Sequence, residues 1–353
     1  MKHVIGFSIA IGIMTVFLSC ASTMPVEQDE EEIMDTQKNT LLAHDVVTFN
    51  ELWSYVLTGR EETLKAEFPL TDVGYFGAEI NNYGKLSGVP DARKLDFYPG
   101  RVHLVAVCNS YGMTHMVLSP DLPFRQMLID DLIHAVVAYD YDGLQIDYEL
   151  VLAADKEHFL SFLEELAARL DALDSSYLEQ GKNPPVFSVA LPARTRYLTE
   201  DAFDYEAINR IADRVFVMAY DEHWSGGTPG PVASLDWCER VAIYALKTID
   251  ASKLIMGQPF YGRTWGDIQP NRAFFHSGME RQITDFNVTD LERTDGILHY
   301  SYTVDLTVTA YFDDAQSIAL RSRIYKDMGV QHSGFWCLGQ EDPLVWTVLS
   351  STE

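Results

Sequence analysis

The sequence at residues 141–150 is Tyr141-Asp142-Gly143-Leu144-Gln145-Ile146-Asp147-Tyr148-Glu149-Leu150. Its aliphatic and aromatic residues are typical of a buried β-strand, yet the same stretch carries acidic residues. Side chains two residues apart lie on one face of a strand, so Gln145, Asp147 and Glu149 are predicted to point in one direction. The stretch therefore predicts a strand with two carboxyl groups close together on one face.

Two carboxyl groups on a buried strand face have unusual acid–base chemistry. Moving an unpaired carboxylate out of water costs several kcal/mol. Neighbouring carboxylates also repel each other, so that one proton tends to be shared and one pKa is raised. A carboxylic acid that stays protonated near neutral pH can protonate the leaving oxygen of a glycosidic bond. The alternative is a strand whose acidic end merely reaches solvent.

The segment Asp142-Gly143-x-Gln145-x-Asp147-x-Glu149 resembles the D-G-x-D-x-D-x-E signature of glycoside hydrolase family 18, the chitinase-like enzymes. Gln145 stands where this signature has its middle Asp. The spore-cortex-lytic peptidoglycan hydrolases of the family often have an amide at this position. The resemblance is therefore closest to that branch of the family.

Three later segments resemble further motifs of the family, and they occur in the family's order. They are Phe216-Val217-Met218-Ala219-Tyr220-Asp221, Leu254-Ile255-Met256-Gly257-Gln258-Pro259-Phe260-Tyr261-Gly262-Arg263 and Gly334-Phe335-Trp336-Cys337-Leu338-Gly339-Gln340-Glu341-Asp342-Pro343. Glu222-His223-Trp224 and Pro229-Gly230-Pro231 extend the likeness to the cortex-lytic branch. The resemblance runs from about residue 46 to the C-terminus, and it implies a catalytic barrel over residues 46–353.

Strand-like segments alternate with helical ones, which predicts an α/β protein with parallel strands, and the resemblance implies a (β/α)8 TIM barrel. The expected strands are 48–56, 71–79, 101–108, 143–149, 186–191, 214–220, 253–260 and 332–338. The expected helices are 123–140, 155–180, 204–212, 232–249 and 313–328. The alternation breaks after Arg263, so residues 265–311 are expected to form a small insertion between strands 7 and 8, either a subdomain wall or a long loop.

Composition narrows the possible functions. A single barrel of this type accommodates 353 residues, of which 47% are hydrophobic. The net charge of −26 argues against nucleic acid as a partner. No phosphate-binding loop, zinc cluster or calcium loop is evident, so no cofactor or metal is expected. Apart from Cys20, the cysteines are Cys108, Cys238 and Cys337, and their odd number and wide spacing predict small buried hydrophobic residues.

The N-terminus has the pattern of an export signal. Lys2 and His3 precede an apolar run from Val4 to Leu18, which is shorter than a membrane-spanning helix needs. Ser19-Cys20 resembles a bacterial lipobox, so residues 1–20 are expected to be a lipoprotein-type signal peptide with lipidation at Cys20. An ordinary cleaved signal or an uncleaved anchor is the alternative. The acidic residues 21–45 are expected to be a flexible tether, which predicts an exported protein anchored to a membrane of the cell envelope.

The family resemblance implies a role for each residue at the strand ends. Glu149 would be the general acid, and Asp147 would orient the acetamido group of N-acetylglucosamine and stabilise the developing positive charge. Tyr220 would hold the acetamido oxygen, and Asp221 would support sugar binding. The acetamido oxygen of the substrate itself, in place of a second carboxylate, would attack the anomeric carbon. The implied substrate is a polysaccharide that contains N-acetylglucosamine.

Other residues have a substrate role by resemblance and a simpler structural alternative. Trp336 would stack under a sugar ring or be part of the core, and Arg263 would bind substrate or form a surface ion pair. Met218 would line the substrate site or pack within the barrel. Asp142 would support the adjoining loop or the carboxylate network.

Gln145 is the main departure from the family signature. It would contribute to the substrate site, and its amide would donate a hydrogen bond to Asp147, which would keep Asp147 ionised and lower its pKa. The leading functional hypothesis is a retaining glycosidase that cleaves β-1,4-linked N-acetylglucosamine polymers, in peptidoglycan or chitin-like glycans. The alternative is a non-catalytic carbohydrate-binding protein of the chitinase-like type. Such proteins usually lack the acid, which is present here as Glu149.

Overall fold

The computed structural model of the protein describes residues 46–267 and 271–352. The expected signal peptide (residues 1–20), the lipidation site Cys20 and the acidic tether (residues 21–45) lie outside the described residues. Within the described ranges, no helix has both the length and the apolar character that crossing a membrane would require.

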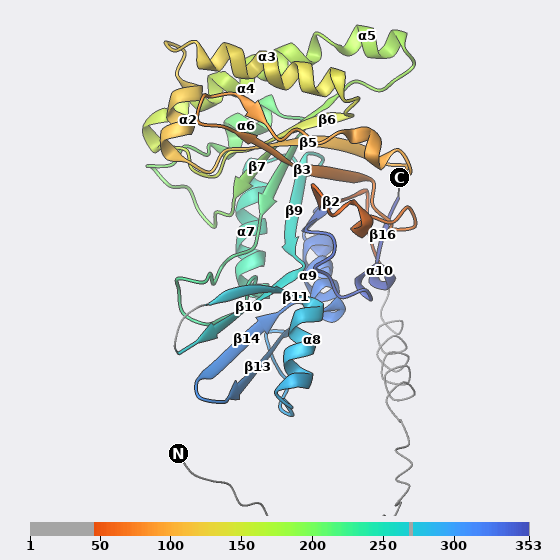
Figure 1. Cartoon of the computed structure of the whole chain (residues 1–353), viewed down its shortest axis with the longest axis vertical. Coiled ribbons are helices and arrows are strands. Elements are labelled where there is room, and N and C mark those ends of the chain that lie inside the picture. Colours follow the sequence, from red (N-terminus) through yellow and green to blue (C-terminus); the bar gives the residue numbers. More distant parts are fainter. Residues whose placement is uncertain (1–45, 268–270, 353) are drawn as a thin grey trace, which may run out of the picture. The chain divides into compact units, whose positions relative to one another are not determined.

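Eight parallel strands form a closed barrel (Figure 1). They are β2 (Glu51–Leu57), β3 (Asp72–Ile80), β5 (Arg101–Val107), β6 (Gly143–Asp147), β7 (Val186–Pro192), β8 (Arg214–Met218), β9 (Leu254–Pro259) and β15 (His332–Trp336). Pairing of β2 with β3 closes the ring, and the short strand β4 (Leu86–Ser87) extends β3 in antiparallel orientation. The barrel architecture predicted from the sequence is confirmed, because each expected strand overlaps an observed one.

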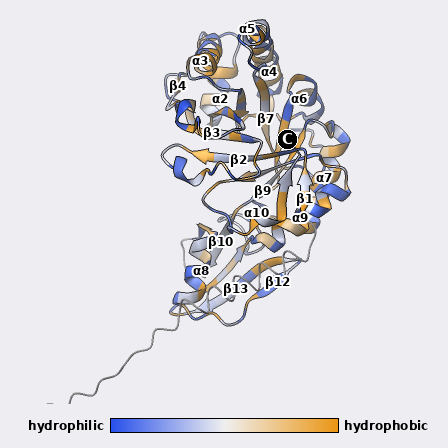
Figure 2. Ribbon diagram, turned by 90° about the vertical axis from the view of Figure 1, so that its right-hand side faces the viewer, coloured by the Kyte–Doolittle hydropathy of each residue, from blue (hydrophilic) through white to orange (hydrophobic). Residues whose placement is uncertain are grey.

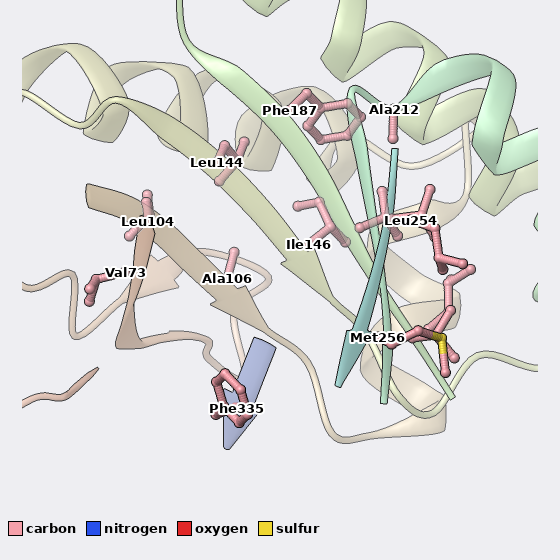
Figure 3. Close-up of a cluster of buried hydrophobic side chains, with 14 of the residues drawn as sticks. Val73, Leu104, Ala106, Leu144, Ile146, Phe187, Ala212, Leu254, Met256 and Phe335 are labelled. Atoms are coloured by element: carbon pink, nitrogen blue, oxygen red, sulfur yellow. The ribbon is translucent and has the colours of Figure 1, made fainter. Parts of the chain in front are cut away.

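Helices cover the outside of the barrel. They are α2 (Tyr111–Leu118), α3 (Phe124–Ala138), α4 (Lys156–Asp171), α5 (Asp174–Glu179), α6 (Tyr205–Ile211), α7 (Leu235–Thr248), α9 (Ala315–Asp327) and α10 (Val345–Val348), with short 3-10 helices at Glu61–Thr63, Ala92–Leu95 and Ala153–Asp155. Outward-facing strand residues such as Leu104, Leu144 and Ile146 form the main core with these helices (Figure 3). Hydrophobic residues are accordingly concentrated along the strands, whereas the helices carry hydrophilic stretches (Figure 2).

A second, smaller core fills the inside of the barrel. It consists of Trp53, Tyr55, Val105, Val107, Ala190, Phe216, Ile255 and Cys337. Glycines make room for the Phe216 ring, since a Cβ atom at Gly334 or Gly257 would lie 2.2 or 2.7 Å from it. Cys108, Cys238 and Cys337 are buried free thiols, as their wide spacing predicted.

The helix expected over residues 155–180 is wrong as a single element. The structure has α4, which ends at Asp171, and a separate α5 that begins at Asp174. The backbone N–H of Leu173 bonds to the carbonyl of Leu170, which tightens the last turn. The sequence Asp174-Ser175-Ser176 favours this break, because short polar side chains compete for backbone groups and prefer helix ends.

Two helix starts show how local side chains set the boundaries. Asp314 caps α9, where its carboxylate accepts from the Ser317 N–H and the Ser317 hydroxyl accepts from the Asp314 N–H, and this agrees with the start expected near 313. Ser110 caps α2 through a single bond, in which its hydroxyl accepts from the backbone N–H of Met113 at 3.4 Å. Helix α2 was not expected, since no helix was predicted between the strand at 101–108 and the helix at 123–140.

The segment between β9 and α9 forms a five-stranded antiparallel sheet (Figure 1). Its strands are β10 (Tyr261–Gly266), β11 (Arg272–Phe275), β12 (Glu292–Thr294), β13 (Ile297–Thr303) and β14 (Thr307–Phe312), and helix α8 (His276–Asp285) joins β11 to β12. A small core that includes Met279, Tyr300 and Phe312 holds this sheet together. Of the two alternatives left open by the sequence, the structure has a sheet, and it begins at Tyr261, four residues before the expected start.

A buried charge network occupies the N-terminal end of the barrel. Glu51 accepts hydrogen bonds from Arg101 and Arg214 at 2.7 and 2.6 Å, and Asp72 accepts from Arg101 at 2.6 Å. The arginines and the neighbouring His332 lower the pKa of Glu51 to about 2, although burial alone would raise it. The terminal strands β1 (Val47–Phe49) and β16 (Leu349–Ser351) pair beside the barrel. This end of the barrel is therefore filled, and the opposite end is left for a site.

Candidate active site

The carboxyl pair predicted from residues 141–150 lies at the C-terminal end of β6. Asp147 is the last residue of the strand and is 5% exposed, and Glu149 follows two residues later with its side chain open to solvent. Active sites of (β/α)8 barrels lie at this end of the strands. The alternation of strand side chains explains the difference between the two groups, because the strand directs Asp147 inward and ends before Glu149.

Of the two carboxyl groups, Asp147 has the more strongly shifted pKa. Burial and, to a smaller extent, the nearby charge of Glu149 together raise its pKa to about 7. Among the described residues, no hydrogen-bond donor lies against its Oδ1 atom. The surrounding side chains therefore stabilise the ionised form of Asp147 poorly.

The pKa of Glu149 is also raised. Partial burial at the barrel mouth is the main cause, and the charge of Asp221 adds to it. The sequence predicted a raised pKa for one carboxyl group of the pair, whereas the pKa is raised for both Asp147 and Glu149. At a pH near neutral, such a pair retains a proton that an isolated surface carboxyl group would have lost.

Gln145 does not have the role expected for it. Its side chain is buried, and its Oε1 atom accepts a hydrogen bond from the Tyr55 hydroxyl at 2.7 Å, while its Nε2 atom donates to the Ser188 hydroxyl at 3.2 Å. The expected hydrogen bond to Asp147 is absent from the described contacts, and the pKa of Asp147 is raised instead of lowered. The expected support of an ionised Asp147 is therefore wrong, and the substrate role of Gln145 stays a prediction. Gln145 fixes Tyr55 beneath the carboxyl pair.

Tyr220 and Asp221 follow the end of β8, two strands from β6 in the barrel. Tyr220 is half-buried, and burial, together with the Tyr55 and Tyr261 hydroxyls and the charges of Asp147 and Glu149, raises its pKa well above the usual value for a tyrosine. Its hydroxyl thus stays protonated and can donate a hydrogen bond. Asp221 has a φ of 61°, a left-handed conformation that Asp tolerates better than most residues.

The carboxylate of Asp221 holds two side chains of β10. Its Oδ1 atom accepts from the Tyr261 hydroxyl at 2.5 Å and from Nη2 of Arg263 at 2.7 Å. The guanidinium group of Arg263 also lies over the Tyr261 ring, with its carbon 5.4 Å from the ring centre. Arg263 was expected to bind substrate or form an ion pair, and it forms the ion pair with Asp221. Tyr261 received no role from the sequence, although it lies two residues before Arg263 and so on the same strand face.

Aromatic side chains form the floor between these groups. Trp336 at the end of β15 is partly exposed and packs against Phe76 and Tyr55, with ring centres 4.9 and 5.2 Å away. Met218 and Tyr220 pack against the same inner core. Sequence reasoning missed Phe76 and Tyr55, although both lie on inward-facing positions of predicted strands. Trp336 thus has one side in the core and one side that can contact a ligand.

Asp142 lies away from the carboxyl pair. Its carboxylate accepts a hydrogen bond from the backbone N–H of Val102 at 2.8 Å, at the N-terminal end of β6. It therefore supports the start of two strands, and the carboxyl pair lies at the other end of β6. Within residues 46–267 and 271–352, no group of three or more His, Cys, Asp or Glu side chains is arranged to hold a metal ion.

These observations define an enzyme-type (β/α)8 barrel, in which acidic and aromatic side chains from several strands meet at the C-terminal end. The model of the glycosyl hydrolases family 18 matches residues 114–341. The chain belongs to this family of glycoside hydrolases, as the sequence motifs predicted.

Relatives with named functions include enzymes of bacterial spores and chitinases. The cortical fragment-lytic enzyme of Bacillus subtilis is 25% identical over 249 residues, which are 66% of this chain and 55% of that protein. The chain thus spans about half the length of that relative. The spore cortex-lytic enzyme SleL of Bacillus cereus has the same fold, with a TM-score of 0.75, 21% identity and coverage of 86% of this chain and 74% of SleL. A class V chitinase mutant from Cycas revoluta, solved in complex with (GlcNAc)3, gives a TM-score of 0.70 at 19% identity, over 84% of this chain and 97% of that one.

Proposed function

We propose that the protein is a retaining glycosidase that hydrolyses β-1,4-linked N-acetylglucosamine polymers by substrate-assisted catalysis. The observation that carries the proposal is the pair Asp147 and Glu149, both with raised pKa, at the barrel end where Tyr220 also lies. A group that gives a proton to a leaving oxygen must be protonated near the working pH and open to the substrate. The raised pKa of Glu149 favours its protonated form, and its side chain is exposed, which supports Glu149 as this group.

The first step breaks the glycosidic bond. Glu149 donates its proton to the glycosidic oxygen, and the bond from that oxygen to the anomeric carbon breaks. The acetamido oxygen of the same sugar forms a new bond to the anomeric carbon, giving an oxazolinium ion. Asp147 takes part as the ionised partner that orients the acetamido N–H and stabilises the positive charge. Its poorly solvated carboxylate gains most from that charge, because burial destabilises it in the free enzyme.

The second step restores the enzyme. A water molecule attacks the anomeric carbon, Glu149 takes up its proton, and the bond to the acetamido oxygen breaks. The stereochemistry is retained because the anomeric carbon is attacked twice. Tyr220 would donate its hydroxyl to the acetamido oxygen through the first step, in accord with its raised pKa. Trp336 would support a sugar ring by stacking, and the Asp221–Arg263 pair would bind sugar hydroxyl groups.

The test is product analysis with a matched inactive variant. The soluble domain, residues 46–353, is incubated with purified peptidoglycan and separately with N-acetylglucosamine oligomers, and the products are identified by mass spectrometry. We expect fragments ending in a reducing N-acetylglucosamine, and a loss of at least about 100-fold in rate for Glu149→Gln. Binding of either polymer without cleavage would contradict the proposal and favour a non-catalytic carbohydrate-binding protein.

We also propose that the enzyme works in the cell envelope, attached through a lipid at Cys20, with peptidoglycan as its polymer. The support is the signal-like N-terminus and the name of the cortical fragment-lytic relative. Metabolic labelling with a radioactive fatty acid tests the anchor. The label should enter the full-length chain and be absent from Cys20→Ala, and equal labelling of both chains would refute it.

A further inference from the structure

Glu149 lies in a part of the chain without regular secondary structure. Strand β6 ends at Asp147, and the next 3-10 turn begins at Ala153. A reacting group that is displaced by about 1 Å can lose roughly 100-fold in rate. The position of Glu149 therefore depends on the contacts that hold the backbone before and after it.

The backbone before Glu149 is anchored through Tyr148. This side chain is 1% exposed and belongs to the core between the barrel and its helices. Its ring stacks with Phe159 and Phe162 of α4, with ring centres 6.4 and 5.9 Å away. The anchor fixes the chain up to Tyr148, and the peptide groups after Glu149 have to be fixed by another element.

The backbone after Glu149 is held by Thr114 of α2. Thr114 is fully buried, and its hydroxyl lies 2.6 Å from the carbonyl oxygen of Leu150 and 3.1 Å from the carbonyls of Ser110 and Tyr111. A hydroxyl has one proton to donate, and the Ser110 carbonyl already accepts from the Thr114 N–H at 2.9 Å. The shortest contact therefore receives the proton, and Thr114 donates to Leu150.

His115, the next residue of α2, holds the far end of the same segment. Its Nδ1 atom lies 2.9 Å from both carboxylate oxygens of Asp155, which can only accept a hydrogen bond when ionised. Asp155 is 2% exposed and ends the 3-10 turn that leads into α4. Helix α2 thus holds the beginning and the end of residues 150–155 through two consecutive side chains.

We propose that Thr114 is a positioning residue for Glu149. With Tyr148 fixed on one side and the Leu150 carbonyl on the other, the backbone of Glu149 is held in place and its side chain leaves the chain in a fixed direction. Glu149 acts first as an acid and then as a base, so it needs the same position in both steps. The inference rests on the proposed glycosidase function and adds to it a buried residue that acts through the backbone.

The experiment compares two substitutions of Thr114 in the full-length protein. Thr114→Val keeps the shape and removes the hydroxyl, whereas Thr114→Ser keeps the hydroxyl. On N-acetylglucosamine oligomers we expect Thr114→Val to lower kcat by about tenfold or more, with KM changed by less than about twofold. Thr114→Ser should restore most of the wild-type kcat, because it can still donate to the Leu150 carbonyl.

Thr248→Val is the matched control. The Thr248 hydroxyl bonds to the carbonyls of Tyr244 and Ala245 in its own helix, α7, so its loss should leave kcat and KM unchanged. Circular dichroism shows whether each variant is folded. Thr114→Ala lacks the same hydroxyl and takes the place of Thr114→Val if the latter does not fold.

Three results would overturn the assignment: a wild-type kcat for Thr114→Val, equal losses for Thr114→Val and Thr114→Ser, or the same loss in the control. If the wild type cleaves no glycan, the proposed glycosidase function fails, but hydrogen exchange still tests the contact. The backbone amides of residues 148–153 should then exchange at least about tenfold faster in Thr114→Val than in the wild type and Thr114→Ser. Equal exchange in all three proteins would overturn the assignment independently of catalysis.

Discussion

Replacement of Asp147 by Asn should stabilise the folded protein relative to the wild type at neutral pH. In acid this gain should disappear, and only the pH-independent effect of the substitution should remain. The pKa of Asp147 rises from its ordinary value of 3.8 to about 7 on folding, first because of burial and second because of the charge of Glu149. The ionised carboxylate therefore destabilises the folded state. An amide of the same shape carries no charge at any of these pH values.

The sign and size follow from proton linkage. Between pH 3.8 and 7 the folded state binds more protons at this residue than the unfolded state does, so the free energy of unfolding falls as the pH rises. One pKa unit corresponds to about 1.4 kcal/mol, so the loss approaches about 4 kcal/mol above pH 7 and is less than half of that at pH 5. Asp147→Asn removes this dependence, and its advantage over the wild type should grow by roughly 2–3 kcal/mol from pH 5 to pH 8.

Urea denaturation of the soluble domain, followed by tryptophan fluorescence at several pH values, measures the difference. Glu149→Gln serves as a second probe, because it removes one cause of the raised pKa and should move the pH-sensitive range of the wild-type curve downward. The wild-type and Asp147→Asn curves should converge toward acid pH and separate toward pH 8. A stability difference between them that stays constant from pH 5 to pH 8 would refute a raised pKa for Asp147.

Four further substitutions test the site and the fold. Tyr220→Phe removes the hydroxyl expected to hold the acetamido oxygen, so kcat on N-acetylglucosamine oligomers should fall by about 100-fold, and an unchanged kcat would contradict that role. Trp336→Ala removes the exposed ring face and should raise KM by roughly fivefold to tenfold, measured in the same steady-state assay; an unchanged KM would indicate a packing role alone. Arg321→Ala leaves the buried Asp313 carboxylate unpaired and should lower the free energy of unfolding in urea by about 3–5 kcal/mol. Arg240→Ala breaks an exposed ion pair and should change the free energy of unfolding by less than about 1 kcal/mol. Equal effects of Arg321→Ala and Arg240→Ala would contradict the difference expected between a buried and an exposed ion pair.

The barrel and its carboxyl pair could be predicted because both depend on local periodicity. The two-residue repeat of β6 assigns Leu144 and Ile146 to the outer core and Asp147 to the inside, whatever the neighbouring strands are. For Trp336 it was the family resemblance, and not the strand repeat, that suggested a place under a sugar ring or in the core. The sheet before α9 was harder to predict, because antiparallel strands such as β10 and β14 take their register from each other and carry no strong pattern of their own.

The break between α4 and α5 could not be predicted from periodicity, which continues through it. Leu170 and Leu173 have the three-residue spacing of a helix face, yet the chain leaves the helix after Asp171. The signal was the polar sequence from Asp174 onward, which competes with helical hydrogen bonds. Helix α2 was missed for a related reason, since its start depends on the cap made by Ser110, and a single serine is a weak signal when no apolar repeat follows clearly.

The direction of the Gln145 amide is a property of the fold that no local pattern contains. The sequence places Gln145 and Asp147 on one strand face, and a hydrogen bond between them was the simplest arrangement. In the folded barrel, Tyr55 from β2 and Ser188 from β7 approach Gln145 from other strands and take both ends of its amide. Asp147 is left without that donor and keeps its proton to a higher pH. The middle Asp of the family signature is therefore replaced by a neutral amide that holds Tyr55. The charge of Glu149 then acts on the pKa of Asp147, and the charge of Asp221 acts on the pKa of Glu149. An aspartate introduced at position 145 would add a buried negative charge beside Asp147, and it should shift the pH range of activity upward as well as destabilise the fold.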